Sequence, residues 1–493
     1  MLDEWSLFWV GGPVGEASEW LDREGGCGLE SREQALGFRE GQPILVDPHF
    51  RVDPRLSEFF RRSRFARLEV GSQDSYVRDY RLLFTHLWRE GRYWDEATVG
   101  DLETWEEWRL RGVGNPGRVG GAKFRRELAA FRLLYEWSAR RGYVRASPVQ
   151  LREVRLPGGR VAQVAELTPK NVRSSNVKWV TPRAFRLWRD VGLRGYGADG
   201  LPERAWRGRN DGRDAAFADL LFSSGLRRRE AGTLLTSELP EVLLPRSYYA
   251  GRVASAVAKT SGRFFYVSRP ALTAVGVYRV TTRAEAVRKA QAAGRYERLP
   301  VRWVVRSMNR AGRLAWVDER GRRCEALLDG LTDRQRVHLY TEGEQGLEPL
   351  ALWLTETGLP LRYRGWSGIF ERASARCARL GLPVFCTPHI CRHSFALRML
   401  VTLSRVLDRR LGLTPKERRE YEELYGNVWL LVRDLLGHRS EVVTREIYLE
   451  PVRGLQLDTL LSGEEEASDN EELLARLAAT TGLILDHAQE ARV

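Results

Sequence analysis

The stretch that decides how this chain is interpreted reads Thr387-Pro388-His389-Ile390-Cys391-Arg392-His393-Ser394-Phe395-Ala396. Two further blocks belong with it. Upstream stands Ser224-Gly225-Leu226-Arg227-Arg228-Arg229-Glu230, and downstream stands Leu435-Leu436-Gly437-His438-Arg439-Ser440. Tyr448 follows His438 by ten positions. In this order the blocks supply two arginines, two histidines and a tyrosine, which are the groups needed to break a phosphodiester with a tyrosine nucleophile.

The chemistry explains why these residue types matter. Charge builds on the non-bridging oxygens of a phosphodiester as the nucleophile enters, and fixed cations aimed at them lower the barrier. Arginine suits this task because its planar fork binds two oxygens and keeps its charge, so Arg227 and Arg392 are the candidates. Tyr448 is the candidate nucleophile. A phenol has a pKa near ~10 and must lose its proton during attack, and His389 and His438 are the candidate groups to assist.

The leaving oxygen of a phosphodiester needs an acid. Arginine cannot supply a proton, whereas a lysine surrounded by other cations can. Only six lysines occur in the chain, and Lys259 lies in a hairpin-like turn, Ala258-Lys259-Thr260-Ser261-Gly262-Arg263-Phe264. Lys259 is therefore one of the few residues that could supply the proton, with a simple phosphate contact as the alternative role.

The order and local spacing of these blocks resemble the tyrosine site-specific recombinase (phage integrase) family. The resemblance implies that Arg227 and Arg392 grip the scissile phosphate and that a lysine between two strands, here Lys259, is the acid. It implies that His389 assists proton transfer, that His438 hydrogen-bonds the phosphate or orients the site, and that His393 is mostly structural. Glu230 would orient the site by pairing with a cationic side chain, the alternative being a surface salt bridge. The turn departs from the family's commoner Gly-Lys-Gly form.

The family implies a multidomain chain: an α-helical N-terminal core-binding domain plus a mixed α+β tyrosine-recombinase catalytic domain with insertions. We place a Gly- and Pro-rich extension of unknown role at 1–65, the helical DNA-binding domain at 66–150, a linker at 151–180 and the catalytic domain at 181–462. Insertions are expected at about 271–345 and 402–427. An acidic tail with an amphipathic helix follows at 463–493.

Local patterns place several elements. A helix capped by Ser72 or Asp74 and a second one around Phe124–Trp137 carry apolar residues at spacings of three and four. Their arginines are either a DNA-contacting face or a solvated surface. A helix begins at Thr181-Pro182, with Thr as N-cap, and residues 264–270 and 298–317 predict strands.

Composition fits a polyanionic partner. Lys and Arg outnumber Asp and Glu by 79 to 65, which gives a net charge of +14 and favours binding to DNA. Five scattered cysteines favour a reduced protein over a disulfide or zinc protein. No apolar run approaches the ~20 residues of a membrane span, and we expect no signal peptide. The sequence contains no ATP-binding loop motif. No metal or other cofactor is expected.

The predicted function is a site-specific DNA recombinase that cuts and rejoins DNA through a 3′-phosphotyrosine, independently of metal and ATP. It would be an integrase or transposon recombinase of a mobile element, bacterial or phage-encoded, cytoplasmic and nucleoid-associated. Its expected partners are double-stranded recombination sites, three further copies in a homotetramer that passes through a Holliday junction, and accessory DNA-bending proteins. The alternatives are a type IB topoisomerase-like or telomere-resolving enzyme, and a non-catalytic DNA-binding protein of the same fold.

Overall fold

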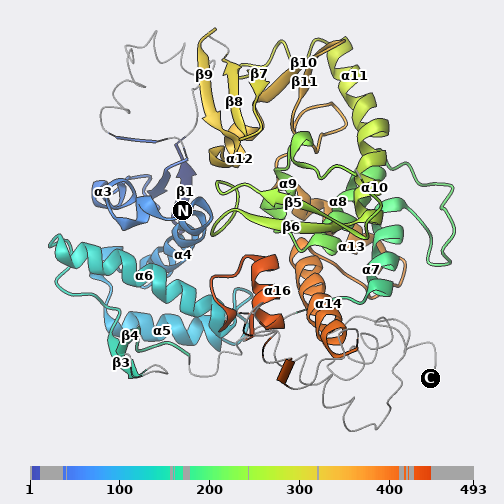
Figure 1. Cartoon of the computed structure of the whole chain (residues 1–493). Helices are drawn as coiled ribbons and strands as arrows, with labels where there is room; N and C mark the ends of the chain where they lie inside the picture. Colours follow the sequence, from blue (N-terminus) through green and yellow to red (C-terminus); the bar gives the residue numbers. More distant parts are fainter. Residues whose placement is uncertain are drawn as a thin grey trace. The chain divides into compact units, whose positions relative to one another are not determined.

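The chain forms two compact units, residues 1–173 and 174–493 (Figure 1). The computed structural model describes residues 3–10, 37–39, 41–155, 159, 161–169, 178–242, 244–318, 321–409, 416–417, 420, 423, 427–442 and 444–445. Tyr448 and the predicted tail at 463–493 lie outside these residues. No helix within the described ranges is both long enough and apolar enough to cross a membrane.

The first unit is mainly helical. Its helices are α3 (Pro54–Arg62), α4 (Val70–Arg89), α5 (Val99–Leu110) and α6 (Gly121–Arg140), with 3₁₀ turns η1 (Arg64–Arg67) and η2 (Trp94–Glu96). Two antiparallel hairpins complete it: β1 (Ser6–Trp9) with β2 (Pro43–Val46), and β3 (Leu151–Arg155) with β4 (Val161–Ala165). The two apolar stripes predicted from sequence meet in its core, where Tyr80 donates a hydrogen bond to the Ala130 carbonyl at 2.8 Å.

Three features of this unit differ from the pattern expected of the sequence. Among the described residues before 66, Trp5, Leu45 and Phe59 are buried in the same core as α4 and α6. The expected linker at 151–180 begins with the β3–β4 hairpin, whose Ala165 is packed into that core. Helix α4 begins at Val70, ahead of the expected caps, and Glu69 precedes it without a side-chain capping bond.

The arginines predicted on these helices form ion pairs within the unit. Arg126 bonds the buried Asp79, and Arg89 and Arg81 both contact Glu4. These pairs are partly exposed, so the guanidinium groups remain accessible to a second anion.

The second unit combines helices with two sheets. Its helices are α7 (Pro182–Trp188), α8 (Asp211–Ser224), α9 (Arg228–Gly232), α10 (Arg269–Tyr278), α11 (Ala284–Ala292), α13 (Gly365–Arg379), α14 (Pro388–Arg409) and α16 (Val428–Leu436). Thr181 caps α7 with its side chain, and Pro182 occupies the first turn, as predicted. Shorter turns are η3 (Arg189–Leu193), η4 (Thr236–Glu238) and η5 (Arg279–Arg283). Helix α8 is central: Phe217 stacks on Trp366 with ring centroids 3.5 Å apart.

One sheet is the hairpin of β5 (Tyr248–Val253) and β6 (Arg263–Ser268), which lies against α8 and α16. The other has the order β11-β10-β7-β8-β9, and all of its strands except β11 lie in the expected insertion at 271–345. Its strands are β7 (Trp303–Met308), β8 (Arg313–Val317), β9 (Arg323–Leu327), β10 (Leu339–Gly343) and β11 (Gly346–Pro349). Pairing is antiparallel except between β7 and β10. The strand predicted at 264–270 corresponds to β6, which ends at Ser268, where α10 follows. The strands predicted at 298–317 correspond to the β7–β8 pair.

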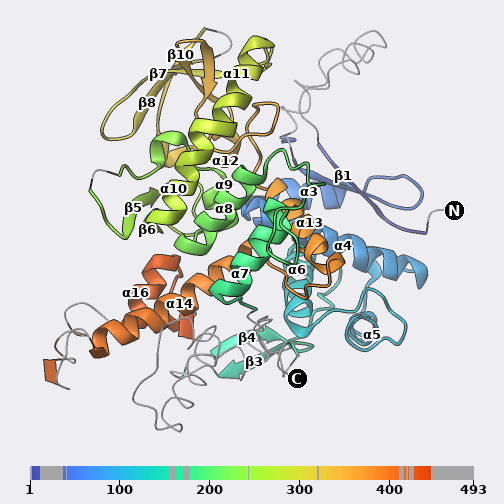
Figure 2. The same ribbon diagram turned by 90° about the vertical axis from the view of Figure 1, so that its right-hand side faces the viewer.

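Between β9 and β10 the chain makes a 3₁₀ turn, η6 (Leu328–Gly330), and a short helix, α12 (Asp333–Arg336). The two views place this five-stranded sheet at one end of the second unit, next to α11 (Figure 2). Helices α14 and α16 pack together at another side of the unit (Figure 2). The second expected insertion, at 402–427, begins as the last turns of α14 and then lies mostly outside the described residues.

Candidate active site

The first block of the sequence forms a tight connection between α8 and α9. Gly225 ends α8 in the left-handed conformation, with φ of +63°. A Cβ atom at this position would lie 2.2 Å from Cδ1 of Phe395 on α14. Glycine is therefore required on two grounds, the backbone angle and the close approach of a side chain. The connection leaves Arg227 as the residue that caps α9.

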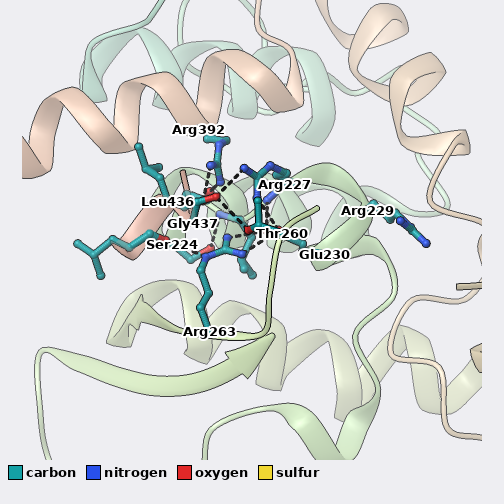
Figure 3. A network of polar contacts seen from close by, with 12 residues as sticks. Ser224, Arg227, Arg229, Glu230, Thr260, Arg263, Arg392, Leu436 and Gly437 are labelled. Atoms are coloured by element: carbon teal, nitrogen blue, oxygen red, sulfur yellow. Dashed lines mark hydrogen bonds and ion pairs between the residues drawn. The ribbon is translucent and has the colours of Figure 1, made fainter. Parts of the chain in front are cut away.

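Glu230 connects two arginines of the site. Its buried carboxylate accepts hydrogen bonds from the Arg227 backbone N–H at 2.8 Å and from Arg227 Nη1 at 2.9 Å. It also receives both terminal nitrogens of Arg263, at 2.8 and 2.7 Å. Burial alone would raise the pKa of Glu230, but the hydrogen bonds and charge of Arg263, with the charges of Arg392 and Arg227, lower it to about 2. Glu230 therefore stays ionised and holds two arginines in place (Figure 3).

Three arginines converge on the C-terminal end of α16. Arg263 Nε donates to the Leu435 carbonyl at 3.1 Å, Arg392 Nη2 donates to the Leu436 carbonyl, and Arg227 Nη2 donates to the Gly437 carbonyl at 3.1 Å. The last carbonyls of a helix have no partner within it and carry partial negative charge. The end of α16 thus gathers cations at the block that carries His438 (Figure 3).

Helix α14 brings the second block to the same place. Arg392 is buried and its Nη1 donates to the Gly225 carbonyl at 2.6 Å, which joins α14 to the α8–α9 connection. His389 precedes Arg392 by one helical turn and is exposed. The pKa of His389 is lowered below its ordinary value. The largest cause is desolvation by the surrounding protein, and the charges of Arg392, Arg227 and Lys259 add to it. A neutral imidazole, able to accept a proton, is the expected form of His389 near pH 7.

His393 packs beside His389, with ring centroids 4.1 Å apart. It is buried, and this burial, with the charges of His389, Arg392 and His438, lowers its pKa to about 2. His393 therefore stays neutral. Its enclosure on α14 agrees with the structural role that the family resemblance implies.

His438 follows the end of α16 and is partly buried. Its Nδ1 lies 2.9 Å from Oγ1 of the buried Thr444. Burial first, then the charges of Arg392 and Arg227, lower the pKa of His438 to about 3. The hydroxyl fixes the ring and leaves Nε2 to bind an incoming group. His438 is therefore an oriented neutral imidazole beside three arginines.

Lys259 lies in the connection between β5 and β6, as predicted, and its side chain is exposed. The neighbouring Thr260 Oγ1 donates to the Gly437 carbonyl at 3.4 Å, which fastens this connection to the end of α16. The charge of Lys259 contributes to the lowered pKa of His389. The structure thus brings Arg227, Glu230, Lys259, His389, Arg392 and His438 into one site. Tyr448 lies outside the described residues, and its position stays a prediction.

Two residues of the site were missed from the sequence. Arg263 is the cation that holds Glu230, and Thr444 is the partner that orients His438. Arg263 belongs to the predicted Lys259 turn, but no motif distinguishes it from the many other arginines of the chain. Its position as the first residue of β6, directly after the turn, is the signal that was available.

The matches to known proteins come from structure and not from sequence. No protein-family model and no curated protein matches the chain. A post-cleavage complex of the site-specific recombinase XerH, bound to palindromic difH substrate, matches over 80% of either chain at 10% identity and a TM-score of 0.40. The pre-cleavage XerH complex matches over 78% of either chain, at 12% identity and a TM-score of 0.38. The integrase from mycobacterium phage Brujita matches over 80% of this chain and 95% of its own, at 14% identity and a TM-score of 0.20.

Proposed function

We propose that this protein is a site-specific DNA recombinase that breaks and rejoins DNA through a 3′-phosphotyrosine on Tyr448. The observation that carries the proposal is that Arg227 and Arg392 converge on the end of α16 beside His438, with His389 one helical turn from Arg392. Lys259 joins them from the β5–β6 connection. This set supplies every group that the chemistry needs other than the nucleophile, and the Tyr448 position follows His438 by ten residues.

The cleavage reaction forms one bond to phosphorus and breaks another. The Tyr448 phenol oxygen attacks phosphorus, and its proton passes to His389, whose lowered pKa keeps the ring neutral and able to accept it. Arg227 and Arg392 bind the non-bridging oxygens, where negative charge grows. His438 donates a hydrogen bond through Nε2 to the same phosphate. The phosphorus–O5′ bond breaks, and Lys259 protonates the departing oxygen.

The arginines need not be reorganised to receive a phosphate. Both are already fixed by carbonyl and carboxylate partners, so the cost of ordering two long side chains has been met on folding. The covalent phosphotyrosine keeps the energy of the broken bond, so religation by the reverse steps needs no ATP. In recombination, the 5′-hydroxyl that attacks it comes from the partner DNA.

The function is tested with nicked duplexes made from the DNA that flanks the gene, which trap the cleaved state because a short fragment diffuses away. We expect a protein–DNA adduct stable to denaturation, and strand exchange between two intact sites. Adducts and plasmid relaxation on any sequence, without strand exchange, would indicate a topoisomerase instead. Binding with no adduct on any substrate would indicate a non-catalytic DNA-binding protein.

A further inference from the structure

The connection that carries Lys259, residues 254–262, is held at its first end by one acidic residue of the five-stranded-sheet region. Asp329, in η6 directly after β9, accepts a hydrogen bond from the Ser255 backbone N–H through Oδ1 at 3.0 Å. Its backbone carbonyl accepts another from the Ala256 N–H at 2.9 Å. Ser255 Oγ in turn accepts from the Gly262 N–H at 3.2 Å, which closes the connection on itself.

Gly262 shows how closely these groups are packed. A Cβ atom there would lie 2.8 Å from Ser255 Oγ and 3.4 Å from Asp329 Oδ1. A side chain at Gly262 would therefore displace the hydroxyl that joins the two ends. The base of the connection is built around Asp329, and Lys259 and Thr260 stand exposed beyond it.

Asp329 belongs to a segment, residues 328–336, that is itself fixed to the chain directly after α9. Arg336 is fully buried and forms a bidentate pair with Glu238 at 2.7 and 2.9 Å. The same guanidinium donates to the carbonyls of Leu328 and Leu331, on either side of Asp329. The position of Asp329 is therefore set by buried contacts and does not depend on the exposed tips of the sheet.

A second link runs through the helix that carries Glu230. Arg229 on α9 donates to Asp333 Oδ1, from Nε at 3.0 Å, and to the Ala256 carbonyl at 3.3 Å. Arg229 thus joins segment 328–336 to the Lys259 connection, and α9 places Arg227 and Glu230 beside it. Arg227, proposed to bind phosphate, and Lys259, proposed to protonate the leaving group, are therefore held by one connected set of contacts.

From these contacts we infer that Asp329 is a positioning residue for Lys259, and that the sheet region containing it contributes to catalysis. The inference rests on the proposed role of Lys259 as general acid. A lysine side chain has many rotamers, and proton transfer tolerates little error in position. Asp329 fixes the backbone from which Lys259 extends. Only the Lys259 side chain then has to be ordered for its ammonium group to reach the leaving oxygen.

The inference is tested by cleavage rates on two substrates, an ordinary duplex and one with a 5′-bridging phosphorothiolate. A thiolate leaves without protonation, so this substrate bypasses the acid. Asp329→Ala should slow cleavage of the ordinary duplex by up to about tenfold, the scale expected for the loss of one hydrogen bond, and the phosphorothiolate should restore most of the rate. Asp329→Asn keeps an acceptor oxygen and should stay within a few-fold of wild type on both.

Asp318→Ala is the matched control. Asp318 lies between β8 and β9 in the same sheet and accepts from Arg322 N and Nε, away from the Lys259 connection. It should leave both rates near wild type. Thermal unfolding of each variant checks that the unit is folded.

Three results would overturn the inference. Asp329→Ala could cleave the ordinary duplex at the wild-type rate, or it could be equally slow on both substrates, which indicates a general structural role. The variant Lys259→Ala distinguishes a failure of the positioning role of Asp329 from a failure of the acid assignment of Lys259. If the phosphorothiolate rescues Lys259→Ala but not Asp329→Ala, only the positioning role fails. If it does not rescue Lys259→Ala, the acid assignment fails and the inference fails with it.

Discussion

Replacing Glu230 with glutamine should destabilise the second unit in a way that depends on pH. The carboxylate is buried and receives bonds from Arg227 and Arg263, so the change leaves positive groups facing a neutral amide. A pKa lowered from 4.5 to about 2 corresponds to roughly 3 kcal/mol of stability at neutral pH. Removing one partner of a buried ion pair typically costs about 3–5 kcal/mol, which agrees.

The sign of the pH effect follows from the lowered pKa. The carboxylate contributes its full stabilisation above the unfolded-state value of 4.5, and loses it as the pH falls towards about 2. The difference between wild type and Glu230→Gln should therefore be largest near neutral pH and fall to about half near pH ~3. Denaturant unfolding of the full chain, followed by tryptophan fluorescence across this range, measures it.

Glu325→Gln is the matched control for this experiment. Glu325 also pairs with an arginine, Arg313, but both side chains are more than half exposed. Exposed pairs contribute about 0–1 kcal/mol, so this variant should be nearly neutral. A Glu230→Gln protein as stable as wild type at neutral pH, or a difference that does not change with pH, would refute the reasoning.

Other consequences can be measured separately. Gly225→Ala should cost at least about 1 kcal/mol and reduce DNA cleavage, because of the positive φ and the contact with Phe395; an unchanged melting temperature would contradict this. His438 should remain neutral in the free protein down to about pH 4, because its pKa is lowered to about 3; an NMR titration near pH ~6.5 would oppose that. Residues 174–493 alone should fold but bind the site more weakly, with a shallower dependence on salt; equal affinity and slope would show that the first unit does not bind DNA.

The sequence predicted those parts of the site that depend on local spacing. Thr181-Pro182 starts a helix, as predicted, because the capping chemistry is local. The Lys259 turn could be placed from the strand that follows it. These features need only the residues within one or two turns of the chain.

Contacts between distant segments could not be predicted in this way. Asp329 meets Ser255 across 74 residues, and no pattern in either segment indicates the other. Trp5 lies beside a Gly-rich stretch that suggested irregular chain, yet its indole is buried against Phe84 with ring centroids 5.1 Å apart. Burial of this kind depends on which surface the rest of the fold leaves available.

The central claim is that a tyrosine of this chain becomes covalently joined to DNA at the site assembled around α16. The most direct measurement is mass spectrometry of the peptide that remains attached to a nicked substrate after proteolysis. The account predicts a phosphodiester to the 3′ end of the DNA on Tyr448, and no adduct with Tyr448→Phe, which should still bind the same duplex. An adduct on another residue, a 5′ linkage, or an adduct that persists in Tyr448→Phe would contradict it.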